Sequence, residues 1–169
     1  MPIRPIVAVV VGLITGLFAV VAFSNDGDLD TSFGGSGEVS AFVGTAGGGD
    51  VKVLGQADGG VVLIGTTGGG AIGVTRLHAD GSTDTSFGVN GKTIVAVPSG
   101  GSAYSALGAL DAAGRIVAGG TVEFGDHSVM FVMRLTGSGQ LARRRQHSAR
   151  WESRRPGTTA GSCGRLSPS

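Results

Sequence analysis

Asp26 to Val39 reads DGDLDTSFGGSGEV, and Asp80 to Thr93 reads DGSTDTSFGVNGKT. The two segments share the pattern D-G-x-x-D-T-S-F-G-x-x-G at a displacement of 54 residues. Two further pairs of segments repeat in the same order. GGVVLIGT from Gly59 pairs with GRIVAGGT from Gly114, and AIGVTRL from Ala71 pairs with VMFVMRL from Val129. Matches in one order at nearly one spacing indicate an internal duplication.

Each repeat unit contains four short apolar segments rich in valine and threonine, which favour β-strands. The Asp58-Gly59 pair between two such segments predicts a hairpin with a type I′ turn. Four strands per unit in tandem are typical of β-propeller blades. We therefore predict an all-β fold of two tandem four-stranded units that form an incomplete array. The predicted strands are Glu38–Val43, Val51–Leu54, Val61–Thr66, Ala71–Leu77, Thr93–Val97, Ala103–Leu107, Ile116–Val122 and Val129–Leu135.

The repeated motif resembles a known family. D-G-x-x-D-x-S-F-G-x-x-G, a D-G hairpin and a strand that ends in Arg-Leu are similar to the delta-60 repeat. The resemblance covers about residues 26–141, as units of about 26–79 and 80–135. It implies an exported bacterial protein with a β-propeller-like array, and it implies no defined activity. The family usually strings together more than two units.

The first residues have the layout of an export signal. Arg4 precedes an unbroken apolar and small-residue run over residues 6–23, and Ala22-Phe23-Ser24 offers small residues where a signal peptidase cleaves. We expect an apolar helix here and a signal peptide over residues 1–24. A retained membrane anchor is the alternative, since 18 residues are near the lower limit for a span. Both predict export of the body, to the periplasm, the cell surface or the medium.

Charge divides the rest of the chain into two parts. Residues 25–141 carry five basic and eleven acidic side chains, a net charge of −6, whereas residues 142–169 carry seven arginines and one glutamate. A mildly acidic body argues against a nucleic-acid partner. The arginine-rich segment lacks valine, isoleucine and phenylalanine, and we predict that it is disordered. A reading-frame slip, a natural solvated tail and a basic binding patch all remain open.

Some motifs suggest ligands but fit them poorly. Asp26, Asp28 and Asp30 alternate as in a calcium loop, but Thr31 and Gly37 stand where that loop needs glycine and glutamate. We expect these aspartates to cap turns. Gly91-Lys92-Thr93 suggests the end of a phosphate loop, but Ser86 stands where that loop needs a glycine. The glycine-rich stretch 65–70 is followed by the expected strand Ala71–Leu77, whereas a phosphate loop needs a helix there. We expect no metal or cofactor.

Catalytic motifs are lacking. The histidines, His78, His127 and His147, occupy unrelated repeat positions, no Gly-x-Ser-x-Gly elbow is present, and Cys163 is the sole cysteine. A serine hydrolase triad assembles in space, so a secreted hydrolase stays as a remote alternative.

The repeated aromatic and basic residues suggest structural roles. Phe33 and Phe87 share one repeat position, and we expect each to fill a core. We expect Arg76 to bind the Asp84 carboxylate, and Arg134 to play the equivalent part.

We therefore expect an exported, non-catalytic β-repeat protein that binds a surface polymer or a protein, or serves as cell-surface structure. It would contact a membrane only through residues 6–23, if they are not removed. The alternative is a truncated, non-functional fragment of a longer β-propeller protein, motivated by the composition break at residue 142.

Overall fold

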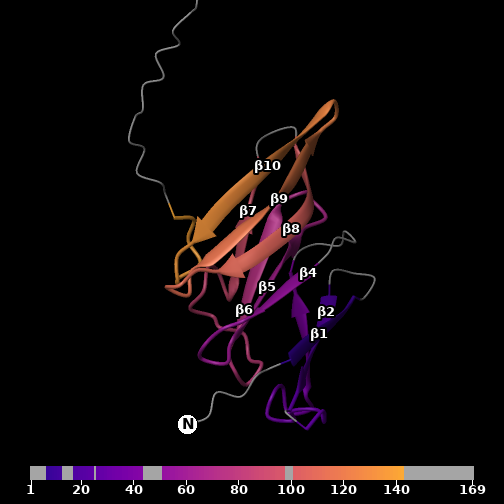
Figure 1. Cartoon of the computed structure of the whole chain (residues 1–169), viewed down its shortest axis with the longest axis vertical. Coiled ribbons are helices and arrows are strands. Elements are labelled where there is room, and N and C mark those ends of the chain that lie inside the picture. Colours follow the sequence, from indigo (N-terminus) through magenta and orange to yellow (C-terminus); the bar gives the residue numbers. More distant parts are fainter. Residues whose placement is uncertain (1–6, 13–16, 25, 44–50, 98–100, 143–169) are drawn as a thin grey trace, which may run out of the picture.

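The computed structural model describes residues 7–12, 17–24, 26–43, 51–97 and 101–142. In these residues the fold is all-β, without a helix, and its strands form three antiparallel sheets (Figure 1). Sheet A has the order β1-β2-β3, sheet B the order β4-β5-β6-β7 and sheet C the order β10-β9-β8. The strands are β1 Val7–Gly12, β2 Leu17–Phe23, β3 Glu38–Phe42, β4 Val51–Gly55, β5 Val61–Thr66, β6 Ile72–Leu77, β7 Lys92–Val95, β8 Ser102–Leu110, β9 Ile116–Phe124 and β10 His127–Leu135.

All eight strands expected from the sequence are present, with ends that differ by no more than three residues. Their grouping into sheets differs from the repeat units. Lys92–Val95, which follows the second D-T-S-F-G turn, pairs with β6 of the preceding unit and completes sheet B. Sheet B therefore contains the last strands of one sequence unit and the first strand of the next. The cause is the turn after β6, which reverses the chain so that β7 pairs with β6.

The apolar run near the N-terminus is not the helix that we expected. Its described residues form β1 and β2, which pair from Val7 with Phe23 to Gly12 with Phe18. Valine is stiff at χ1 and favours strands, and the glycines disfavour a helix. Val20 and Ala22 are buried, while Ala19 and Val21, which alternate with them, are partly exposed, as strand alternation requires. No described helix is long and apolar enough to cross a membrane.

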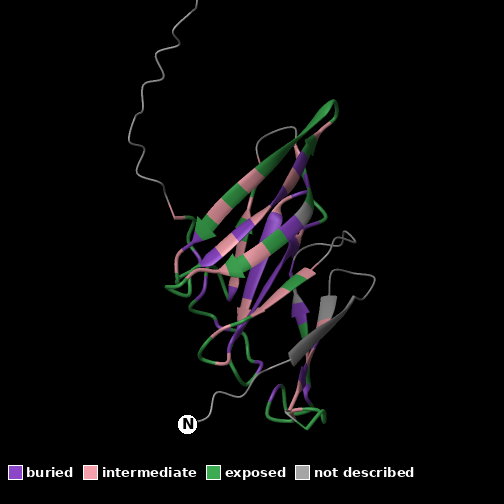
Figure 2. Ribbon diagram, viewed as in Figure 1, coloured by how far each residue is buried: buried purple, intermediate pink, exposed green. Residues whose placement is uncertain are grey.

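Sheet B lies between the other two sheets, and its strand β5 contributes side chains to both cores. Val61 and Leu63 point to the core shared with sheet A, whereas Val62 and Ile64 point to the core shared with sheet C. All four side chains are fully buried, and Figure 2 shows this buried strand between more exposed ones. When a strand is covered on both faces, its sequence is a continuous run of apolar residues and does not alternate between apolar and polar ones.

The hairpin at Asp58-Gly59 is present, but its turn is of another type than predicted. Gly59 has a φ of +87°, while Asp58 is not among the described residues with positive φ. The Gly59 amide donates to the carbonyl of Gln56, and the Gly60 amide donates to Asp58 Oδ1. This is a type I turn followed by a left-handed glycine. The aspartate side chain supplies a bond that a type I′ turn would not need.

Candidate functional site

Three turns with the same backbone geometry follow β2, β6 and β10, and we call residues 26–37, 80–91 and 136–142 the first, second and third turn. In each, one backbone amide closes a bond of 2.8 Å across the turn: Ser24 to Asp28, His78 to Ser82, and Thr136 to Gln140. An isolated bridge recurs beside it, joining Phe23 with Leu29, Leu77 with Thr83, and Leu135 with Leu141. The third turn keeps this geometry although its sequence lacks the D-x-x-D-T-S-F-G motif.

Successive turns are stacked by backbone hydrogen bonds. The Gly34 amide donates to the Asp80 carbonyl at 2.8 Å, and the equivalent Gly88 amide donates to the Ser138 carbonyl at 2.9 Å. At Gly81, with φ +82°, an added Cβ would lie 2.6 Å from Val39 Cγ2 and 3.0 Å from the Gly34 nitrogen. The motif glycine is therefore needed for its φ and for the close approach of the preceding turn.

The motif phenylalanines fill the two cores, as the sequence predicted. Phe33 is 1% exposed and lies in the core between sheets A and B, and Phe87 is 0% exposed and lies in the core between sheets B and C. Burial leaves neither ring free to stack on a ligand.

The motif aspartates cap their own turns. Asp30 Oδ1 accepts hydrogen bonds from the amide and hydroxyl of Ser32, and Asp84 Oδ1 accepts the same pair from Ser86. Asp26 and Asp28 are exposed. Within the described ranges, no group of three or more histidine, cysteine, aspartate or glutamate side chains could hold a metal ion. Asp30 therefore has the turn-capping role that we expected for these aspartates.

Arg76 binds Asp84, as the sequence predicted, and it also reaches the third turn. Its Nε lies 2.6 Å and its second guanidinium nitrogen 2.5 Å from Asp84 Oδ2. A further nitrogen donates to the Gly137 carbonyl at 2.6 Å, and the guanidinium lies 4.7 Å from the centre of the Phe87 ring. The Ser86 hydroxyl and the guanidinium hold the pKa of Asp84 below its usual range. The ion pair therefore ties β6 to the second turn, and the bond to Gly137 joins sheet B to the turn that follows sheet C.

Arg134 occupies the equivalent place after β10 but has no equivalent partner. The residue eight positions after Arg76 is Asp84, whereas eight positions after Arg134 stands Ala142. The Ala142 amide still donates to the Arg134 carbonyl, as the Asp84 amide does to that of Arg76. The Arg134 side chain is exposed. The backbone of the turn is kept here, and its ion pair is lost.

A polar pocket of about 500 Å³ opens beside the second turn. Its polar lining brings together Gln56 and Asp58 of the hairpin with Arg76, His78, Asp80 and Asp84. His78 Nε2 lies 3.7 Å from Asp84 Oδ1, and the Ser82 hydroxyl lowers the pKa of Asp80. The lining contains no serine, threonine, cysteine or tyrosine. The pocket can therefore accept hydrogen bonds from a polar ligand, but it offers no hydroxyl or thiol nucleophile.

Sequence reasoning did not foresee that the hairpin contributes to this pocket. Gln56 and Asp58 are far from Asp84 in the chain, and they approach it because β5 pairs with β6. The pairing of Val61 with Leu77 brings the start of β5 beside the end of β6, so the adjoining loops meet. Only the pairing of the consecutive strands Val61–Thr66 and Ala71–Leu77 could have indicated this.

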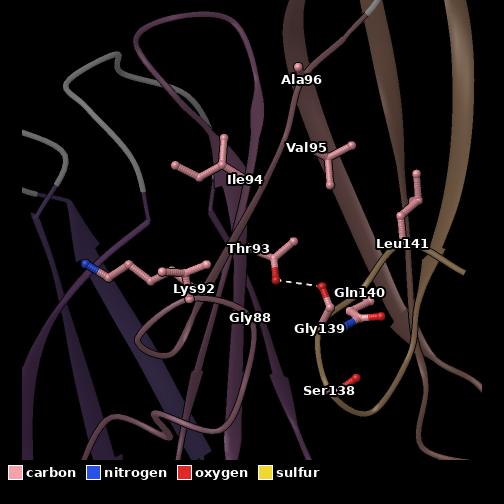
Figure 3. A pocket seen from close by; sticks show the side chains of 11 residues that line it. Gly88, Lys92, Thr93, Ile94, Val95, Ala96, Ser138, Gly139, Gln140 and Leu141 are labelled. Carbon is pink, nitrogen blue, oxygen red and sulfur yellow. Dashed lines mark hydrogen bonds between the residues drawn. The ribbon is translucent and has the colours of Figure 1, made fainter.

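A second, more apolar groove of about 790 Å³ lies between β7 and the third turn. Thr93 Oγ1 donates to the Gly139 carbonyl at 2.7 Å and links β7 to the third turn (Figure 3). Val95 and Leu141 line the groove beside this bond. Gly91-Lys92-Thr93, considered above as the end of a phosphate loop, is thus the start of an edge strand.

The remaining sequence candidates take structural or isolated places. The 65–70 stretch is the tight turn between β5 and β6, closed by the Thr67 amide on the Ala71 carbonyl. His127 stacks on Phe124 with ring centres 5.1 Å apart, and Nδ1 lies 2.6 Å from Asp126. It therefore lies on the β9–β10 hairpin, away from the polar pocket. His147, Cys163 and the rest of residues 143–169 lie outside the described residues, as does Arg4.

The repeat geometry agrees with a comparison against known protein families. Residues 56–87 match a beta-propeller family. Its description is a domain of unknown function, DUF5122, with a beta-propeller fold. The matched part of the chain contains the hairpin, β5, β6 and the second turn as far as Phe87. No curated protein and no solved structure matches the chain.

Proposed function

We propose that this protein is a non-catalytic β-propeller repeat module of the delta-60 type, exported to act in binding or in cell-surface structure. The DUF5122 match supports a β-propeller repeat. The delta-60 type rests on the D-T-S-F-G motif at Asp30 and Asp84. A non-catalytic role is supported by the observation that the polar groups of the motif bond to one another within the fold. The Asp84 carboxylate accepts hydrogen bonds from Ser86 and Arg76, and Arg76 also donates to the Gly137 carbonyl in the third turn.

Binding is best supported at the polar pocket. Carboxylates and an amide in one concave surface accept hydrogen bonds from hydroxyl groups, as on a cell-surface polysaccharide. The test is co-sedimentation with insoluble cell-wall polysaccharide. We expect that the wild type sediments and that Asp58→Asn and Gln56→Ala weaken binding, while Val89→Ala does not. A wild type that stays in solution, or pocket variants that sediment equally well, would overturn this assignment.

A catalytic role is tested by a panel of ester, peptide and glycoside substrates. We expect no turnover. The pocket lining lacks the hydroxyl or thiol nucleophile of esterases and peptidases, and its aspartates, whose carboxylates could serve glycoside hydrolysis, accept hydrogen bonds within their own turns. His78 is the histidine of this pocket, so His78→Ala is the informative variant. Turnover that is present in the wild type and lost in that variant would establish a hydrolase and refute the non-catalytic proposal.

Export rests on the order of Arg4, the apolar run 6–23 and Ala22-Phe23-Ser24. Removal of residues 1–24 would take away β1 and β2 and uncover Val61 and Leu63 of sheet B. The experiment is N-terminal sequencing of the protein from the medium, the periplasm and the cytoplasm. Protein outside the cytoplasm that starts near Asn25 supports export with cleavage, and Met1 in a membrane pellet supports an anchor. Soluble cytoplasmic protein that keeps Met1 refutes export.

The loss of the repeat motif inside the third turn favours a second candidate, a fragment of a longer β-propeller protein. Ala142 replaces the aspartate of the motif, and the arginine-rich segment begins there. Translation of the other two reading frames beyond Leu141 is the test. A further D-x-S-F-G in either frame would establish this candidate, and its absence from both would remove it.

A further inference from the structure

The outer face of sheet C carries an exposed apolar patch. Leu107, Met130 and Val132 are 64%, 85% and 78% exposed, and Figure 2 shows β10 as a largely exposed strand. Register places these side chains together, since Leu107 and Val132 both pair with Gly119 on β9. Exposed apolar patches of this kind mark interaction surfaces on soluble proteins.

The repeat shows what covers such a face. Val74 on β6 and Val132 on β10 are equivalent, because each stands three positions before the last residue of its strand. Likewise, Val62 on β5 corresponds to Val117 on β9. In sheet B these positions are 1% and 0% exposed, because sheet C packs on them. The same repeat positions are thus buried on sheet B by a neighbouring sheet of the same kind and left open on sheet C.

Sheet A offers the complementary face. Sheets A, B and C are stacked in one direction, so that each sheet uses one face for its predecessor and the other for its successor. Ala19, Val21 and Phe23 of β2 hold the positions of Phe131, Met133 and Leu135 of β10, which pack toward sheet B. These three residues of β2 are partly exposed in the chain by itself.

We propose that the outer face of sheet C docks on the free face of sheet A in a second copy of this chain, head to tail. Such an interface joins different surfaces of the two copies, so that it closes into a ring or extends as a filament. It would repeat between chains the sheet stacking that the structure has within one chain. If residues 1–24 are removed, the acceptor is the face of sheet B with Val61 and Leu63, which carries the same repeat positions as the face of sheet A.

The first test is the mass of the full chain by analytical ultracentrifugation over micromolar to submillimolar concentration. We expect concentration-dependent association of the wild type. Val132→Lys should weaken it by roughly tenfold or more, because the ammonium would be buried without a partner. Val89→Lys is the matched control, since Val89 is a valine with 76% exposure that lies in the second turn, and it should associate as the wild type does. A monomeric wild type, or a Val132→Lys chain that associates equally, overturns the proposal.

The second test fixes the direction. Val21→Lys should block the acceptor face, so it should not associate by itself. In an equal mixture with Val132→Lys, each variant keeps one intact face, and we expect a dimer with one copy of each and nothing larger. Val21→Lys that associates by itself, or a mixture that stays monomeric while both variants are folded by circular dichroism, refutes the head-to-tail interface.

Discussion

Phe87 shows how a single side chain serves two sheets. Its ring is fully buried in the core between sheets B and C, and the guanidinium of Arg76 covers it. Gly139 of the third turn approaches the same ring, since an added Cβ would lie 3.0 Å from Phe87 Cε2. The motif phenylalanine is therefore a core residue and a support for the following turn, and its neighbour Arg76 ties that turn in place.

Replacement of the motif phenylalanines should destabilise the fold. We expect Phe33→Ala and Phe87→Ala each to lower the free energy of unfolding by about 3 kcal/mol, because each removes a fully buried ring and leaves a cavity. Urea denaturation measures this. Ile94→Ala, at a 63% exposed position, serves as the control and should change stability little. Losses below about 0.5 kcal/mol for both phenylalanines would contradict their role in the core.

The ion pair of Arg76 and Asp84 should make stability depend on pH. The pKa of Asp84 is lower in the folded chain than its unfolded value of about 3.9, so its contribution is present above that pH and is lost as pH falls through the folded pKa. At pH 7 we expect Asp84→Asn to cost about 2 kcal/mol, as for a hydrogen bond to a charged group.

The measurement is urea denaturation of wild type and Asp84→Asn at pH 7 and below pH 4. The difference in unfolding free energy between them should shrink progressively as the pH falls from about 3.9 toward the folded pKa of Asp84, because the unfolded chain then takes up a proton that the folded chain does not. Asp26→Asn is the matched control, since Asp26 is an exposed aspartate in the first turn. An unchanged difference at both pH values would show that the Asp84 charge contributes nothing.

At the scale of elements, the turns rather than the strands carry the specificity of the repeat. The strands of equivalent position differ widely, as IGVTRL in β6 and LFAVVAF in β2 show. The turns keep the same amide-to-carbonyl bonds and left-handed glycines, Gly27, Gly81 and Gly139, at φ between +78° and +88°. Strands need only alternation and β propensity, whereas a turn needs particular residues at particular φ.

Two glycine substitutions separate the loss of stability caused by a left-handed φ from the loss caused by disturbing the contact between successive turns. Gly27→Ala should destabilise by about 1–2 kcal/mol through its left-handed φ alone, because nothing lies within 4 Å of the added Cβ. Gly81→Ala should cost clearly more, because its Cβ would meet Val39 and the Gly34 backbone of the preceding turn. Thermal and urea denaturation compare the two. Equal losses would show that the turns do not support one another.

At the scale of the whole molecule, stability comes from stacking three sheets. Sheet B is covered on both faces, while sheets A and C have one free face each in the described part of the chain. β10 is an edge strand of sheet C, whereas its equivalent β6 is paired on both sides by β5 and β7. An open edge and an open apolar face both favour pairing with another chain.

A chain that stops after Ala142 should retain the stability of the whole chain. The third turn is closed by bonds from Thr136 to Gln140 and from Ala142 to Arg134, all within residues up to 142. Deletion of 143–169 should therefore change the free energy of unfolding by no more than about 0.5 kcal/mol. Urea denaturation of both forms gives the comparison. An unfolded shortened chain would show that the arginine-rich segment is part of the fold.

The sequence by itself determined the all-β class, the repeat and the eight strands between Glu38 and Leu135, because alternation, β propensity and turn residues are local properties. It also determined the cores at Phe33 and Phe87, because the two phenylalanines share one repeat position. It determined the Arg76–Asp84 pair as well, because an arginine at the end of a strand attracts a carboxylate in the turn that follows. The tertiary structure alone decided that Lys92–Val95 completes sheet B, and that the described part of the apolar run forms strands over it. It also decided that Gln56 and Asp58 join the polar pocket. These features depend on which strands pair across the sheet and which faces become covered, and such nonlocal contacts override the preferences of a segment read by itself.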